Sequence, residues 1–116
     1  MIPREMTSIM QLNPDFSLAK GEAKKHGSRP AAETVWSVKS ISQSEDFETN
    51  LDEFTRFLYP YLPALKQLAP RCKIEFDCIV EIQHGEEVPP LGCTKQAIRF
   101  LAEVNGEFNI DLYCLD

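Results

Sequence analysis

The sequence lacks the features that would indicate a membrane protein or a metal protein. Its apolar runs are far shorter than the roughly 20 residues that a membrane-spanning helix needs, and no apolar segment of a signal peptide follows the N-terminus. The four cysteines form no C-x-x-C pair, and His26 and His84 lie far from zinc-ligand spacing. We therefore expect a cytoplasmic protein with no metal and no other cofactor.

Motifs of the common catalytic classes are also missing. The chain has neither the G-x-S-x-G elbow of a serine hydrolase nor the Gly-Lys-Ser/Thr ending of a phosphate-binding loop. A cysteine nucleophile would need an exposed, activated thiol beside a histidine, and only Cys93 with His84 offers such a pair. We therefore expect no catalytic residues and a protein that is not an enzyme.

Length and charge describe what is present. The 116 residues suit one domain, spanning 1–116, with one hydrophobic core. The net charge of −6 is uneven, because residues 1–40 carry six basic and four acidic side chains and residues 41–116 carry six basic and fourteen acidic ones. An acidic body repels nucleic acid and attracts basic partners. Solubility is the alternative reason for such a charge.

The clearest local pattern is the alternation of "CKIEFDCIVEIQ", residues 72–83, in which every second residue is apolar. Such alternation predicts a strand with one buried and one exposed face. Further strands are predicted at 107–115, which also alternates, and at 34–41. The pattern places Cys72, Cys78 and Cys114 in the core as small apolar residues, so only Cys93 is expected to be exposed.

Helices are predicted at residues 3–12, 50–59, 62–69 and 94–104 from the 3- and 4-residue spacing of apolar side chains. Pro3 and Pro63 fit first turns, and Asn50 and Thr94 are the expected N-caps. In the last helix the expected inner residues are Ala97, Ile98, Leu101 and Ala102. The order of elements predicts an α+β fold, a two-layer sandwich with a three- to four-stranded sheet and helices packed on one face.

The charged side of the two long strands is the main candidate site. If the strands are neighbours, five carboxylates share one face and form a partner-binding surface: Glu75, Asp77, Glu81, Glu107 and Asp111. Like charges placed opposite each other are destabilising unless they are hydrated or neutralised by a partner. A solvated face, a docking surface for a basic protein and a metal or paired-carboxylate site all remain open. A flat face without a pocket argues against catalysis.

A basic loop is the second candidate. Its anion-binding residues would be Lys20, Lys24, Lys25 and Arg29, and its glycines would allow backbone N–H groups to turn toward an anion. A mobile charged loop without a ligand is the alternative. The acidic remainder of the chain argues against nucleic acid as a partner. Trp36, the only tryptophan, is expected to anchor the core.

The order of several short segments carries a resemblance. The segments are "PREMTSIMQLNP", "KGE", a tryptophan that opens a strand, "LDEFTRFLYPYLPALKQLA" and "GEFNIDLYCL". This order resembles a family of small bacterial domains catalogued as domain of unknown function number 4279, and the resemblance covers nearly the whole chain. It implies a small α+β domain and no established activity.

One departure from that family concerns a sheet edge. Family members usually begin with a β-strand, whereas here Met1 and Ile2 lead directly into Pro3. Without that strand, a sheet edge would carry unpaired N–H and C=O groups. Another segment, a second copy in a homodimer, or a different partner would cover that edge.

Residues and resemblance together favour a non-enzymatic, protein-binding domain of the bacterial cytoplasm. Its acidic face would engage a basic protein, as an immunity or antitoxin-like inhibitor covers a basic toxin. The alternative is a small-ligand or anion-binding protein, or an enzyme, that uses the loop at residues 20–29. A structural module that works beside another domain is the third reading. We expect neither a membrane nor nucleic acid as a partner.

Overall fold

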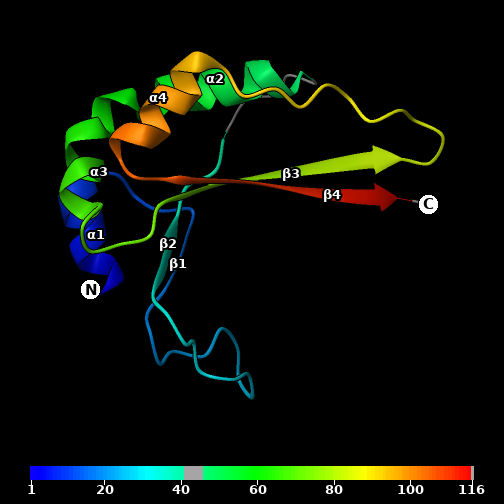
Figure 1. The fold of residues 1–116 in the computed structure, drawn as a ribbon. Coiled ribbons are helices and arrows are strands. Elements are labelled where there is room, and N and C mark those ends of the chain that lie inside the picture. The colour runs from blue at the N-terminus through cyan, green and yellow to red at the C-terminus, as the bar shows by residue number, and fades with distance from the viewer. Residues whose placement is uncertain (41–45, 116) are drawn as a thin grey trace. The chain divides into compact units, whose positions relative to one another are not determined.

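A computed structural model describes residues 1–40 and 46–115. The chain divides into two compact units, Met1–Ser40 and Ile41–Asp116. Helices and strands occur in both units (Figure 1), and the predicted α+β class is confirmed. The single domain over residues 1–116 stays a prediction.

The first unit begins with helix α1, Pro3–Met10. Pro3 occupies the first turn, as predicted, because its missing N–H has no intrahelical partner there. The helix ends at Met10 rather than at residue 12. Gln11 adopts a left-handed conformation with φ 53°, and its N–H donates to the carbonyl of Thr7 at 2.8 Å. The left-handed cap turns the chain toward the strands of this unit.

A short hairpin completes the first unit. Strand β1, Phe16–Leu18, pairs antiparallel with β2, Val35–Ser37, and Ser17 lies opposite Trp36. The sequence pattern did not reveal β1, and β2 covers only part of the strand predicted at 34–41, of which residue 41 lies outside the described residues. The half-buried Trp36 donates from Nε1 to Thr7 Oγ1 at 3.0 Å, so it connects β2 to α1.

The second unit begins with a helical segment that turns at a proline. Helix α2 spans Phe47–Leu58, the 3₁₀ turn η1 spans Tyr59–Tyr61 and helix α3 spans Leu62–Leu68. The predicted break at Pro60 and the predicted start of α3 are confirmed. The predicted N-cap at Asn50 is wrong. Asp46 caps α2 instead, because its carboxylate accepts from Thr49 N at 3.0 Å and from Thr49 Oγ1 at 2.6 Å.

Two long strands and one helix form the rest of the second unit. Strand β3, Glu75–Gln83, starts later than predicted, whereas helix α4, Lys95–Glu103, and strand β4, Glu107–Leu115, match their predictions closely. Thr94 is the N-cap of α4 as predicted, and Asn105, with φ 53°, supplies the left-handed stop. The strands pair in parallel with Glu75 opposite Glu107.

The predicted sheet of three to four strands is corrected by the strand pairing. The described strands form two separate two-stranded sheets, β1–β2 and β3–β4. A hairpin with a long connection pairs β1 with β2 in antiparallel fashion, while the crossover through α4 pairs β3 with β4 in parallel. Within the second unit, the helices lie over one face of β3–β4 (Figure 1).

Aromatic side chains join those helices to the strands. The Phe76 ring, on β3 and 6% exposed, lies 5.5 Å from the ring centroid of Phe54 on α2 and 5.9 Å from that of Phe100 on α4. Phe47 on α2 meets Phe108 on β4 edge to face at 6.4 Å. The even-numbered residues of β3 and β4, which include Phe76 and Phe108, form the face toward the helices, and we call it the inner face. The odd-numbered residues form the opposite face, which we call the outer face.

The buried face of α4 differs in part from its prediction. Ala97 and Leu101 are buried as expected, but Ile98 is 53% exposed and Ala102 is also exposed. Phe100 and Val104 are buried in their place. The buried residues are therefore Ala97, Phe100, Leu101 and Val104, which lie on one side of the helix. On this side the ring of Phe100 faces that of Phe76.

The cap of α4 leads to a prediction about stability. Thr94 Oγ1 accepts the N–H of Ala97 at 3.3 Å and donates to the Asp52 carboxylate of α2, so one hydroxyl caps α4 and links it to α2. We expect Thr94→Ala to lower the free energy of unfolding by about 1 kcal/mol, measured by urea denaturation. Thr94→Ser keeps the hydroxyl and is the control. An equal loss in both variants would contradict the capping role.

Candidate functional site

The outer face of β3–β4 holds all five carboxylates that the sequence predicted for a partner-binding surface. The parallel register places Glu75 opposite Glu107, Asp77 opposite Asn109 and Asp111 opposite Ile79, and Glu81 lies opposite Tyr113. The structure therefore brings the five residues onto one face, as predicted. Only one pair of carboxylates lies directly opposite, because the other carboxylates each face an uncharged residue.

Lys73 bridges that one pair and offsets one of its two negative charges. Its Nζ atom lies 2.8 Å from Glu75 Oε1 and 3.4 Å from Glu107 Oε2, just before β3 begins. The Lys73 hydrogen bond lowers the pKa of Glu75, and the Glu75 hydrogen bond, with the charge of Glu107, raises the pKa of Lys73. All three groups are solvated, and water screens the interaction. This end of the outer face is therefore compensated in part from within the chain.

Asn109 extends the same network along the face. Its Nδ2 group donates to Asp77 Oδ1 at 3.1 Å and lies 3.5 Å from Glu75 Oε2. An amide between two carboxylates separates their charges and occupies one acceptor on each. The sequence pattern did not reveal this role, because it depends on the register between two strands.

The far end of the outer face is different. Ile79 is 65% exposed and Tyr113 is 53% exposed, and both lie beside Glu81 and Asp111. Neither of these two carboxylates forms an ion pair with any residue in the described part of the chain. Leu115, 37% exposed, lies at the end of the same row. This far end, which we call the open end, combines uncompensated acidic groups with exposed apolar and aromatic groups.

Neither Ile79 nor Tyr113 was predicted as a site residue. In the sequence, each interrupts the charged residues on one side of its strand. That interruption was the feature by which they could have been recognised as site residues. A large apolar side chain on a face that is otherwise charged is more informative than the charges themselves. The parallel register then places Ile79, at the middle of β3, two positions from Tyr113 along the outer face.

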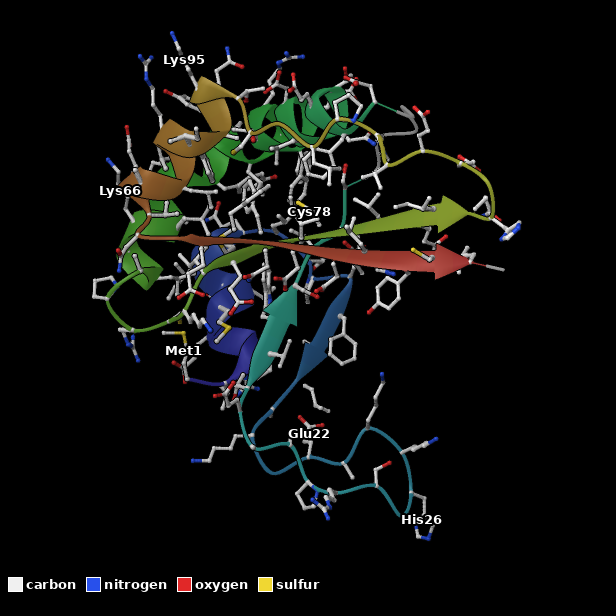
Figure 2. The ribbon with its side chains drawn as sticks, turned by 45° about the vertical axis from the view of Figure 1, so that its right-hand side comes forward. Met1, Glu22, His26, Lys66, Cys78 and Lys95 are labelled. Carbon is white, nitrogen blue, oxygen red and sulfur yellow. The ribbon has the colours of Figure 1, made fainter. Side chains whose placement is uncertain are left out.

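The predicted basic loop forms the long connection of the β1–β2 hairpin, with His26 at its outer turn (Figure 2). Lys20, Lys24, Lys25 and Arg29 are all exposed, and the Lys24 ammonium lies 5.4 Å from the ring centroid of Phe16. The N–H of Gly21 donates to the carbonyl of Ala31 at 2.9 Å, and the N–H of Ala31 donates to that of Glu22 at 2.7 Å.

These internal bonds bear on anion binding by the loop. The amide of Lys20 also donates within the unit, to Thr34 Oγ1 at 2.9 Å, and that of Ser28 donates to the carbonyl of Lys25 at 3.0 Å. Amides used in this way are not directed at a bound anion. The lysine and arginine side chains remain the only cationic groups that an anion would meet there, and the role of this loop stays a prediction.

The cysteines differ from the predicted core positions: Cys72, which precedes β3, and Cys78 are half-buried rather than fully buried. Cys114 is exposed although the alternation of β4 placed it in the core, and Cys93 is half-buried although it precedes a helix in a loop. All four thiols are free. Burial, together with the nearby Cys93 and Asp77, raises the pKa of Cys78 to about 11, and burial and Asp52 raise that of Cys93. A raised pKa lowers the thiolate fraction at neutral pH and thus the reactivity.

Over residues 1–40 and 46–115, no group of three or more His, Cys, Asp or Glu side chains is arranged to hold a metal ion. Within the same ranges, none of the helices combines the length and apolar character needed to cross a bilayer.

Fold and site together define a small α+β domain whose longest strand pair carries a charged outer face. Comparison with known families identifies it further. The model of the family described as domain of unknown function (DUF4279) matches residues 1–115. The chain therefore belongs to this family, as the resemblance in the sequence implied. No curated protein and no solved structure matches the chain.

The Lys73 network predicts a pH dependence of stability. A carboxyl whose pKa is lowered by folding stabilises the native state above its unfolded pKa, and this stabilisation is lost as pH falls through its folded pKa. For Lys73, whose pKa is raised, the stabilisation is present below the unfolded pKa and is lost as pH rises through the folded pKa. Lys73→Met is therefore expected to be less stable than wild type near neutral pH and equally stable at both extremes.

Urea unfolding across the pH range measures that difference, and carboxyl NMR shifts follow the pKa of Glu75, which should return toward its ordinary value in Lys73→Met. Lys66→Met is the matched control. It removes a lysine that pairs with Glu103 at 3.1 Å elsewhere in the unit, and it should leave the pKa of Glu75 in place. A Glu75 pKa unchanged by Lys73→Met would show that the ion pair does not form in solution.

The thiols predict an order of alkylation. Cys114 is exposed, whereas Cys78 lies on the inner face of β3 (Figure 2) with a pKa of about 11. Burial and a raised pKa both lower the reactivity of a thiol. With iodoacetamide and peptide mass spectrometry, we therefore expect Cys114 to react first and Cys78 much more slowly. Urea-unfolded protein is the control, in which all four thiols should react alike. Equal rates in the folded protein would contradict the packing of β3.

Proposed function

We propose that this protein is a non-enzymatic, protein-binding domain whose outer face on β3–β4 engages a basic protein. The observation that carries the proposal is the open end, where Ile79 and Tyr113 are exposed beside Glu81 and Asp111. Exposed aromatic and apolar groups are typical of residues that contribute most to binding at protein interfaces. Uncompensated carboxylates beside them favour a partner of opposite charge.

The overall charge supports the same partner class. Residues 41–116 have a balance of −8, so the second unit attracts cations over longer distances than a single ion pair. Such a field accelerates encounter with a basic protein and discourages encounter with nucleic acid. A concrete form of the proposal is an immunity or antitoxin-like inhibitor that covers a basic toxin in the bacterial cytoplasm.

The compensated end of the face contributes less to this proposal. Glu75 and Glu107 already share Lys73, and a partner cation there would compete with an ion pair that exists within the chain. Binding energy is therefore expected from Glu81 and Asp111 more than from Glu75, Asp77 and Glu107. Anion or small-ligand binding by the loop at residues 20–29, with or without enzymatic activity, stays the alternative prediction.

The proposal is tested at Asp111. The protein is immobilised, a partner is captured from an extract of the source cells and produced in pure form, and its association rate is measured at two salt concentrations. Asp111→Lys is expected to slow association by about tenfold at low salt and by less at high salt, because steering depends on ionic strength. The dissociation rate should change less than the association rate.

Glu53→Lys is the matched control for this experiment. Glu53 is exposed on α2, the helix that packs against the inner face through Phe54, so this variant makes the same change in net charge away from the outer face. A partner that binds both variants equally would contradict the proposed surface. Failure to capture any partner would contradict the proposed function.

A further inference from the structure

We infer that the partner of this domain adds a strand to the free edge of β4, and that the added segment carries basic side chains on one face and apolar side chains on the other. This inference rests on the proposed function, since it specifies how the basic partner binds. The hydrogen bonds between β3 and β4 determine which backbone groups of β4 point away from β3.

The backbone register identifies these groups. The N–H of Glu107 donates to the carbonyl of Ile74 at 2.8 Å, at the start of the parallel ladder. In a parallel pair, a residue that donates to the neighbouring strand also accepts from it, and the next residue directs both groups to the other side. The odd-numbered residues of β4 therefore bond to β3. The even-numbered residues present N–H and C=O at the opposite edge: Phe108, Ile110, Leu112 and Cys114.

This edge has no strand beside it among the described residues, since β4 pairs with β3 alone. Natural edge strands are commonly protected by proline, lysine, a bulge or a very short length. β4 is nine residues long, "EFNIDLYCL", and contains neither proline nor lysine. Its ladder to β3 runs without a bulge from Glu107 to Leu115. The edge is thus a regular template for another strand.

Exposure identifies the part of β4 that is available. All residues from Asp111 to Leu115 are exposed on both faces, and Leu112 on the inner face is 49% exposed. On β3, by contrast, Ile82 is 6% exposed at the corresponding end. The ends of both strands extend beyond the helices of the second unit (Figure 1), so the helices leave this part of β4 uncovered.

The two faces of β4 specify the chemistry of the added strand. The outer face presents Asp111, which has no ion pair within the described ranges, and the inner face presents Ile110, Leu112 and Cys114. Directly adjacent residues on neighbouring strands share a face. A segment with lysine or arginine on the outer face would place a positive charge beside Asp111. Apolar residues on its inner face would lie beside Ile110, Leu112 and Cys114. A second copy of β4 would add further carboxylates to a face that is already acidic.

The probe for this inference is a ten-residue peptide of alternating valine and lysine, with capped ends. Titration into the ¹⁵N-labelled full chain is followed by NMR. We expect the amides of Leu112 and Cys114 to shift and their hydrogen exchange to slow by about tenfold or more as they gain partners. The amides of Asp111 and Tyr113, already directed to β3, should slow much less. A peptide of alternating valine and glutamate is the charge control and should not bind.

Methylation of the peptide amides distinguishes strand addition from simple contact with the outer face. N-methyl groups on the valines should abolish binding if the added strand is antiparallel, because the valine amides then face β4. N-methyl groups on the lysines should abolish it if the strand is parallel. One methylated peptide is expected to lose binding by about tenfold or more while the other keeps it. Equal effects of the two peptides, or no effect of either, would overturn strand addition.

A protein variant gives an independent readout. Leu112→Pro removes one outward N–H and no hydrogen bond to β3, and Leu112→Val is its control with the N–H retained. The proline variant should lose the peptide and the valine variant should keep it. Tyr113→Pro, which removes a hydrogen bond to β3, should instead lower the melting temperature. If Leu112→Pro does not fold, the methylated peptides decide the question alone.

The outcomes separate this inference from the proposed function. Peptide binding that is weakened by Asp111→Lys, but leaves the Leu112 and Cys114 amides unprotected, would retain the acidic docking face and overturn strand addition. Absence of peptide binding would also overturn strand addition, whereas the proposed function is decided by the capture experiment. A dimer of the free chain in light scattering, with the same two amides protected, would show that a second copy occupies the edge and would overturn the inference of a basic partner.

Discussion

The contact of the Phe76 ring with Phe54 and Phe100 is the interaction on which the second unit depends. It joins β3 to α2 and α4 at once, and the ring is almost fully buried. Because successive side chains of a strand point to opposite faces, burying this ring determines the direction of every other side chain on β3. The parallel register with β4, to which Phe47 adds its contact with Phe108, then determines the outer face of both strands.

Local sequence patterns predicted the helices and strands of the second unit better than they predicted which residues pair with one another. The alternation of residues 107–115 and the capping residue Thr94 depend on neighbours in the chain, and both were predicted correctly. The N-cap of α2 was misplaced, because Asn50 and Asp46 both offer a suitable side chain, and the structure shows that Asp46 accepts the N–H and the hydroxyl of Thr49. β1 was missed because three residues are too few to show a period.

The candidate site was predicted in composition but not in arrangement. The five carboxylates share one face, as their period of two required. Their compensation by Lys73 and Asn109 depends on which residues lie opposite each other, and strand order and register cannot be read from one strand alone. The exposure of Cys114 was also not predictable from its strand alone, since the helices cover β4 over only part of its length. Membership of a family of unknown function says nothing about a partner. Any inference about a partner therefore depends on the chemistry of the outer face.

The uneven cover of β3 and β4 has a mechanical consequence. Near Glu75 and Glu107 the strand pair is held by Lys73 and by the aromatic rings of two helices, whereas at Gln83 and Leu115 it extends beyond those helices. A ribbon fixed at one end and free at the other bends most at its free end. Ile82, near the end of β3, is only 6% exposed, so the amplitude of motion should increase along β4 more than along β3. A partner that immobilises the free end loses part of its binding free energy to the entropy of that motion, and gains a surface that can adjust its twist to fit.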